Sequence, residues 1–169
     1  QGEGQVVFGT GEAGIGKTAL VDAFVAGVAA GDRVWIGHGQ CIEQYGAGEA
    51  YLPLLEAVGR LGRSPNGPRF LQLFRRYAPS WLLQLPALVS GDEFADLQRR
   101  TGNATRERML RELAEAVEEL AVEHPVLLVL EDLHWSDGST VDWLAYVARR
   151  REEARLLVVG TYRPVEAMM

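Results

Sequence analysis

The feature that most constrains this chain is a glycine-rich segment at residues 11–18, which reads GEAGIGKT. It matches the pattern G-x-x-x-x-G-K-[ST]. Glycines let successive backbone N–H groups turn inward around an anion, and a helix that follows points its positive end at the same place. The segment therefore predicts a strand before it, a helix after it and a phosphate group bound between the two.

Each residue type in this segment has a chemical task. We expect Lys17 to reach the β- and γ-phosphates and the Thr18 hydroxyl to ligate Mg²⁺. The residues expected to hold the nucleotide are Gly11, Glu12, Ala13, Gly14, Ile15, Gly16, Lys17, Thr18 and Ala19. The alternative is a glycine-rich turn that matches by accident. Lys17 is the only lysine among 17 basic residues, and a chance match is on the order of one in a thousand.

Composition excludes several other classes of protein. The chain has 169 residues, about one domain, and its net charge of −6 argues against direct contact with nucleic acid. A single cysteine, Cys41, excludes a disulfide framework and a multi-thiolate zinc site. No apolar run approaches the roughly 20 residues of a membrane span, and no signal peptide precedes the first strand. We expect a cytoplasmic protein with no membrane contact.

Apolar runs and helical periodicity alternate along the chain. Strands are predicted at 6–10, 34–36, 126–130 and 156–161, and helices at 18–30, 105–121 and 138–150. Continuous apolar strands are typical of a parallel sheet covered on both faces, which predicts an α/β fold of three layers. The helix at 18–30 is apolar nearly all round, so we expect it to be packed on every side. Ser139 and Asp142 have the spacing of a capping box for the last helix.

The middle of the chain is the least regular part. Residues 46–104 are interpreted as an insertion of short helices, including 51–61 and a helix around 70–77, that covers one side of the sheet. Residues 1–169 are interpreted as one nucleotide-binding core, which we expect to belong to a larger multidomain protein.

Two acidic residues follow the strand at 126–130. Phosphoryl-transfer sites of this kind need a carboxylate for the Mg²⁺ shell and often a second acid to orient water. Glu131 is assigned to the metal and Asp132 to the water, and the reverse assignment stays open because the two acids are adjacent and point different ways. A solvated loop start is the alternative. His134 is expected to shape the loop beside the γ-phosphate, and Trp135 to pack.

The last strand ends near Arg163, whose planar fork suits phosphate oxygens. We expect Arg163 to contact the γ-phosphate. The alternative is a surface arginine that precedes a loop.

Four segments resemble one family. GEAGIGKTALVDAF, GHGQC, LLVLEDLHWSDGSTVDWLAYV and LLVVGTYRP are similar to the STAND-type signal-transduction ATPases, in particular to the AAA-type module of large bacterial LuxR-type or adenylate-cyclase-linked regulators. The resemblance implies an ASCE-type P-loop sheet, in which the last strand lies between the loop strand and the strand at 126–130.

The resemblance also implies a function and partners. ATP is expected rather than GTP, with Mg²⁺, and no guanine-reading N-K-x-D motif occurs in the chain. The expected partners are a lid, a winged helix, repeats or an output domain of the same protein, with possible ATP-dependent self-association. Relatives carry a G-R-E-like segment before the first strand and a lid after the last one, and both are missing from this sequence. Hydrolysis is therefore expected to be slow here.

Three functions remain open at this point. The leading hypothesis is an ATPase that acts as a regulatory switch, with Lys17, Glu131, Asp132 and Arg163 as its catalytic residues. The second is a non-catalytic ATP- or ADP-binding module that signals by assembly. The third is a small-molecule kinase, whose lid arginines would be Arg106, Arg108 and Arg111. The apolar stripe on the opposite side of this helix instead favours a solvent-exposed surface with no binding role for these arginines.

Overall fold

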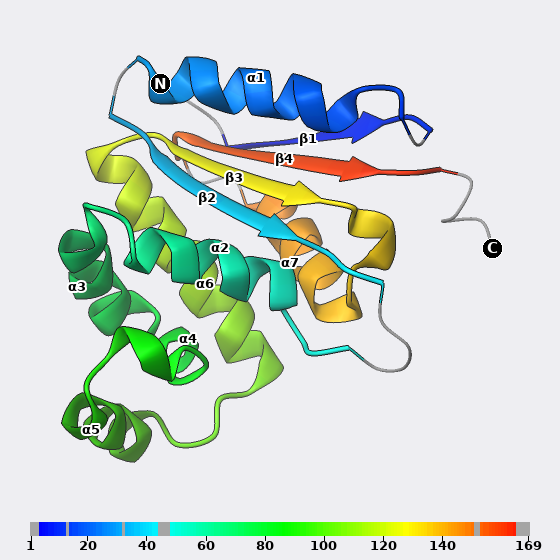
Figure 1. The fold of residues 1–169 in the computed structure, drawn as a ribbon. Coiled ribbons are helices and arrows are strands. Elements are labelled where there is room, and N and C mark those ends of the chain that lie inside the picture. The colour runs from blue at the N-terminus through cyan, green and yellow to red at the C-terminus, as the bar shows by residue number, and fades with distance from the viewer. Residues whose placement is uncertain (1–3, 13, 32, 44–47, 151–152, 165–169) are drawn as a thin grey trace.

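The protein is described here from a computed structural model, which covers residues 4–12, 14–31, 33–43, 48–150 and 153–164. Four strands form one parallel sheet in the order β1-β4-β3-β2 (Figure 1). The strands are β1 (Gln5–Thr10), β2 (Trp35–Gln40), β3 (Val126–Glu131) and β4 (Leu156–Tyr162). The predicted parallel α/β sheet is confirmed, and so is the position of the last strand between the first strand and β3.

Strand β3 lies at the centre of the sheet, and all six of its residues are buried. It pairs in parallel with β2 on one side and with β4 on the other, so that Leu128 is level with Gly37 and Val158. Parallel pairing places the carboxyl ends of all four strands at one edge. The loops that carry the predicted site residues therefore begin at the same edge, where ligands bind in open α/β sheets.

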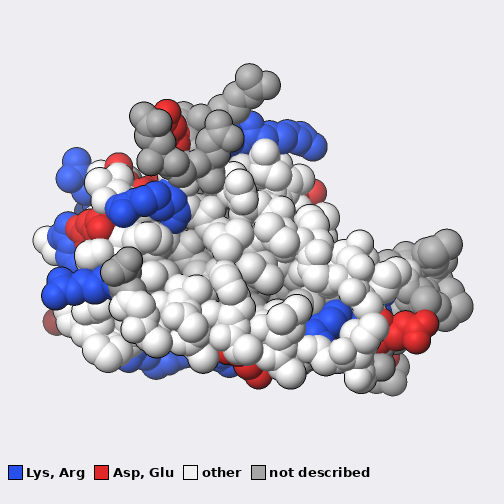
Figure 2. Space-filling model, turned by 90° about the horizontal axis from the view of Figure 1, so that it is seen from above, with Lys and Arg blue, Asp and Glu red and all other residues white. Residues whose placement is uncertain are grey.

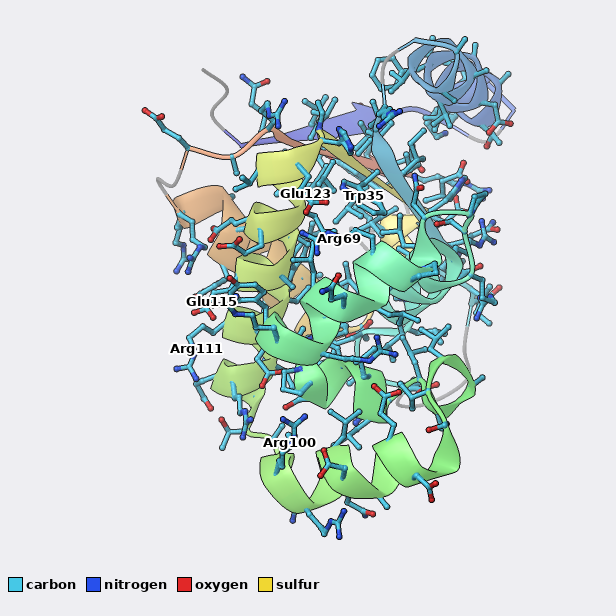
Figure 3. All side chains as sticks on the ribbon, turned by 90° about the vertical axis from the view of Figure 1, so that its left-hand side faces the viewer. Trp35, Arg69, Arg100, Arg111, Glu115 and Glu123 are labelled. Atoms are coloured by element: carbon cyan, nitrogen blue, oxygen red, sulfur yellow. The ribbon has the colours of Figure 1, made fainter. Side chains whose placement is uncertain are left out.

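Helices cover both faces of the sheet (Figures 1 and 3). Of the helices in the described part of the chain, α1 (Lys17–Ala29) is the one that lies on the first face. The other face carries α2 (Leu52–Gly62), α6 (Arg106–Glu123) and α7 (Gly138–Arg149), and beyond them α3 (Gly67–Tyr77), α4 (Pro79–Leu83), α5 (Gly91–Thr101) and the 3-10 turn η1 (Pro86–Leu88). A second 3-10 turn, η2 (Leu133–Trp135), follows β3. Within the described residues, no helix combines the length and apolar character needed to cross a membrane.

Helix α1 is less enclosed than its sequence predicts. Val21 packs against Leu127 and Val129 of β3 and is the buried residue of this helix, whereas Leu20 is 73% exposed and Phe24 is 43% exposed. Figure 2 shows this face of the molecule, which is mostly free of charged side chains. The expectation that α1 is packed on every side is wrong for the described residues, because only its sheet-facing side contacts the core.

Strand β2 is longer than predicted and runs through the segment GHGQC to Gln40. Its glycines explain why helix α2 packs so close to it. A Cβ added at Gly39 would lie 1.8 Å from the carbonyl oxygen of Pro53, and one at Gly37 would meet Leu128 at 2.8 Å. The alternation of glycine with polar residues thus belongs to a strand under a tightly packed helix, not to a loop.

The helical segment after β2 builds much of the core. Phe70, Phe74, Trp81 and Leu82 are fully or almost fully buried there. The helices predicted at 51–61 and 70–77 are confirmed as α2 and α3, while α5 was not foreseen as a separate helix. Helix α2, the first of these helices, lies against β2 and so covers one side of the sheet.

Helix α7 is capped differently from the prediction. The N-cap residue is Asp137, whose Oδ1 accepts a hydrogen bond from Thr140 N at 2.9 Å, so the capping box at Ser139 and Asp142 is wrong. The same Oδ1 accepts from the backbone N–H of Tyr51 at 3.0 Å. Asp137 therefore joins the start of α2 to the start of α7 directly beside the loop that follows β3.

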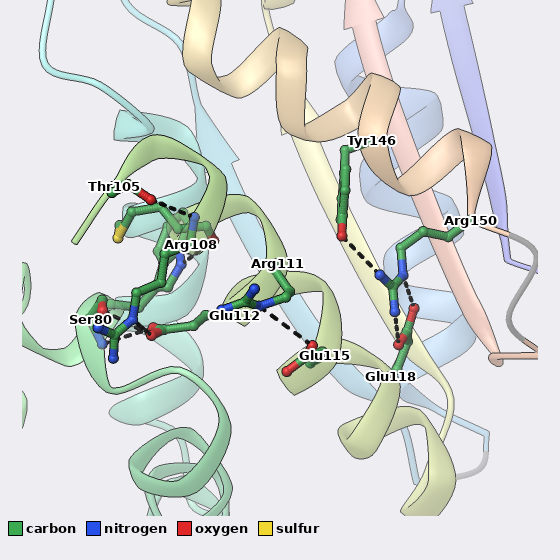
Figure 4. A network of polar contacts seen from close by, with 11 residues as sticks. Ser80, Thr105, Arg108, Arg111, Glu112, Glu115, Glu118, Tyr146 and Arg150 are labelled. Carbon is green, nitrogen blue, oxygen red and sulfur yellow. Dashed lines mark hydrogen bonds and ion pairs between the residues drawn. The ribbon is translucent and has the colours of Figure 1, made fainter. Parts of the chain in front are cut away.

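Ionic contacts fasten the outer helices to α6. Glu112 is 5% exposed and accepts hydrogen bonds from Ser80 N and Ser80 Oγ, both at 2.9 Å, and from Arg108 Nε at 2.7 Å (Figure 4). Arg108 also donates to the carbonyl of Thr101 at 3.0 Å. One buried carboxylate thus connects α4, α5 and α6.

Other ion pairs along α6 are more exposed to solvent than this network. Figure 3 shows Arg69 of α3 directed toward Glu123 at the end of α6, and an ion pair joins them. Arg111 lies 3.9 Å from Glu115 on the exposed side of α6, which agrees with the prediction that this side is solvated surface. Arg108 departs from that prediction because it turns inward to Glu112.

Replacing Glu112 with Ala is expected to lower the free energy of unfolding by about 3 kcal/mol, because Ser80 and Arg108 lose a buried acceptor. The matched control is Glu115→Ala, which removes an exposed pair of the same spacing and is expected to cost less than about 0.5 kcal/mol. Urea unfolding measures both. Equal costs would show that the Glu112 network does not hold the outer helices.

Gly39→Ala is expected to destabilise the fold by about 2–3 kcal/mol, because its Cβ would overlap the backbone of Pro53. The control is Gly27→Ala in exposed α1, where an added Cβ meets nothing within 4 Å and should stabilise the helix by up to about 1 kcal/mol. Thermal unfolding compares the two. A neutral Gly39→Ala would contradict the close approach of α2 to β2.

Candidate functional site

The loop between β1 and α1 has the backbone that its glycines predict. Gly14 and Gly16 adopt positive φ angles of 81° and 95°, which side chains with a Cβ rarely adopt. A Cβ at either position would meet no atom within 4 Å, so it is the backbone angle and not crowding that calls for glycine here. Gly16 is also the N-cap of α1 and offers no capping side chain, which leaves the first N–H groups of this helix for an anion.

Lys17 lies directly at this loop. Its Nζ donates hydrogen bonds to the carbonyl of Gly11 at 2.5 Å and to the carbonyl of Glu12 at 2.8 Å. Thr18 and Ala19 follow in the exposed first turn of α1. The structure therefore gathers the predicted phosphate-binding residues around the loop, with the exception of Ala13, which lies outside the described residues.

Glu131 lies on the same face of the sheet as α1. Leu127 and Val129 of β3 pack against α1, and side chains two apart along a strand share a face, so Glu131 also points to that face. Its side chain is almost fully buried, and the residue is 7% exposed. The carboxylate Oε2 lies 2.5 Å from His38 Nε2 of β2.

Asp132 leaves the strand and has a different environment. Its backbone is left-handed, with φ 57°, and its N–H donates to Thr161 Oγ1 of β4 at 3.1 Å. Its half-buried carboxylate accepts a hydrogen bond from Gln40 Nε2 at 3.2 Å. The two neighbouring acids are thus separated: Glu131 is buried on the α1 face, and Asp132 lies where the strand ends.

His38 and Gln40 are site residues that the sequence analysis missed. Both come from GHGQC, where the polar residues alternate with glycines at a spacing of two. That spacing is the period of a strand and places both side chains on one face. It could have identified them, but the strand was predicted to end at residue 36.

Arg163 lies at the same edge of the sheet, just after β4. Its backbone N–H donates to His134 Nδ1 at 3.3 Å, which joins the end of β4 to the turn η2. His134 therefore shapes this loop, as expected. Trp135 packs against His134 near the surface: their ring centroids lie 5.0 Å apart, and Trp135 is 38% exposed.

A cleft of about 550 Å³ borders these loops. It is lined by Cys41 and Ile42 after β2, by the start of α2, by the segment 134–139 and by Arg106 of α6. Burial raises the pKa of the Cys41 thiol to about 11. At neutral pH a thiol with this pKa is mostly protonated, the state in which cysteine is least nucleophilic.

The donor atoms at this edge suit a hard cation. The Thr18 hydroxyl and the carboxylates of Glu131 and Asp132 provide oxygen, which Mg²⁺ prefers. Within the described residues, no group of three or more His, Cys, Asp or Glu side chains is placed to hold a metal by itself. Mg²⁺ usually takes one or two carboxylates together with substrate phosphates and water, and these residues fit that requirement.

Two comparisons with known proteins agree with this geometry. A family model described as "AAA ATPase domain" matches residues 1–159. The chain is also 32% identical over 180 residues to "Uncharacterized protein R02095" of Rhizobium meliloti (strain 1021), an alignment that covers 96% of the chain. The chain spans 16% of the length of that relative.

Proposed function

Because the chain belongs to the family of AAA ATPase domains, we propose that it binds ATP with Mg²⁺ and hydrolyses it slowly, as the switch domain of a larger signalling or transcription regulator. The observation that carries this proposal is the pairing of an open glycine loop holding Lys17 with a buried acid, Glu131, on the same face of the sheet. The switch role is supported by the STAND-like segments and by a relative about six times longer than the chain.

The proposed reaction is the in-line attack of water on the γ-phosphorus of ATP. The bond from this phosphorus to the bridging oxygen breaks, and ADP and inorganic phosphate leave. Lys17 and the N–H groups of the loop offset the charge that develops on the phosphate oxygens. Asp132 orients the water and takes up its proton, and Arg163 binds a γ-phosphate oxygen. Mg²⁺ held by Thr18 and Glu131 would supply further positive charge at the phosphates.

Glu131 suits the metal better than Asp132 for a structural reason. Its buried carboxylate shares the face of α1, whose first turn carries Thr18, whereas Asp132 follows the end of β3 with a left-handed backbone and a half-buried side chain. This favours the first of the two assignments that the sequence leaves open.

A second candidate function is a non-catalytic nucleotide-binding module that signals by assembly. The exposed apolar side chains of β1 and α1, Phe8 and Leu20 among them, favour contact with another surface. Release of inorganic phosphate discriminates between the two candidates. Equal background rates for the unaltered chain and a Glu131→Ala/Asp132→Ala double variant would support the binding-only function.

Replacing Lys17 with Ala is expected to weaken ATP binding by at least about 10-fold, because the ammonium no longer reaches the phosphates. The control is Arg33→Ala, which removes an exposed positive charge before β2, at the opposite edge of the sheet. Titration with a fluorescent ATP analogue measures both affinities. Unchanged affinity in the Lys17 variant would refute the assignment of the loop.

Glu131→Gln and Asp132→Asn are expected to separate metal binding from hydrolysis. The first should raise the Mg²⁺ concentration needed for nucleotide binding, because it removes a ligand charge. The second should leave that concentration unchanged and slow phosphate release about 100-fold, a usual effect of losing a proton acceptor. The opposite outcome for the two variants would reverse their roles.

A further inference from the structure

The buried acid Glu131 has a single side-chain partner. Among the described residues, His38 alone forms a side-chain hydrogen bond to its carboxylate, with 2.5 Å between Nε2 and Oε2. Both side chains are largely shielded, being 26% and 9% exposed. An ionised carboxylate accepts hydrogen bonds, and an imidazole in this position donates to it through Nε2–H.

The backbone around His38 holds the imidazole firmly in place. Its neighbours Gly37 and Gly39 turn toward α2, which packs against β2 too closely for a side chain at Gly39. In the parallel register His38 is level with Val129, two residues before Glu131, and the N–H of Cys41 donates to the Glu131 carbonyl at 2.9 Å. The imidazole therefore reaches forward along the α1 face from a strand that pairs with β3 along one edge and is covered by α2 on its other face.

We propose that His38 is the positioning residue for Glu131. Its Nε2–H would hold Oε2 and leave Oε1 as the oxygen with which Glu131 would serve Mg²⁺. This inference rests on the proposed function, because it assumes that Glu131 serves the metal. A ligand held by a partner in this way loses less conformational freedom on binding metal, and removing such partners weakens metal binding by about 10–100-fold.

The neighbouring acid provides an internal comparison. Asp132 receives its hydrogen bond from Gln40, the next residue on the same face of β2, and not from His38. Loss of the imidazole should therefore act on Glu131 and on metal affinity, while the affinity of metal-free nucleotide, which depends on Lys17 and the loop, stays the same.

The test is a Mg²⁺ titration of the full chain with a bound fluorescent ATP analogue, together with the analogue's affinity in EDTA. His38→Leu and His38→Asn remove the hydrogen bond, the second because its amide is too short to reach Oε2. His38→Gln keeps an N–H near the position of Nε2. The control is His124→Gln, which removes an imidazole that packs on Trp35, beyond the opposite end of the sheet.

His38→Leu and His38→Asn are expected to raise the Mg²⁺ midpoint about 10-fold. His38→Gln and His124→Gln should stay within about 2-fold, as should the affinity of every variant in EDTA. Because His38→Asn and His38→Gln are both polar and similar in size, their difference separates the hydrogen bond from any loss of folding in His38→Leu. Equal midpoints for these two variants would overturn the inference.

Glu131→Gln tells apart the failure of this inference from the failure of the proposed function. If Glu131→Gln raises the midpoint and the His38 variants do not, only the positioning role is wrong. If Glu131→Gln has no effect, the metal assignment is wrong and the positioning role falls with it. In a Glu131→Gln background, His38→Asn should raise the Mg²⁺ midpoint by less than about a further 2-fold. If it raises the midpoint as much as it does alone, His38 acts through a residue other than Glu131.

Discussion

The parallel pairing of β3 with β2 and β4 is the constraint on which the rest of the structure depends. It places the carboxyl ends of four strands at one edge, and the glycine loop, the two acids and Arg163 all follow those ends. Side chains along the buried strand β3 alternate between the two faces of the sheet. Glu131 therefore faces α1, as Leu127 and Val129 do. The position of the acid relative to the loop is thus a consequence of strand packing.

Much of this arrangement could be predicted from the sequence, because strong local patterns determine it. The glycine loop, the apolar strand at 126–130 and the amphipathic helix α6 each have a signature that depends on few distant contacts. The resemblance to AAA-type modules then implied the strand order, which residue patterns alone do not contain. The loop positions of Lys17 and Thr18 followed from the same motif.

The features that were missed depend on tertiary packing. GHGQC looks like a loop until α2 lies over β2, and only then do its glycines become close-contact positions and His38 a partner of Glu131. Asp137, the local cap of α7, also accepts from the N–H of Tyr51 in a distant segment, a contact that no local pattern reveals. The enclosure of α1 was overestimated because an apolar composition does not reveal which neighbours a helix has.

The most direct test of the central claim is a crystal structure of the chain with Mg²⁺ and a non-hydrolysable ATP analogue. We expect the phosphates to lie against the glycine loop, with Lys17 Nζ moved from the carbonyls of Gly11 and Glu12 to the phosphate oxygens, and the metal to lie between Thr18 and Glu131. A nucleotide bound elsewhere, or a metal that avoids Glu131, would contradict it.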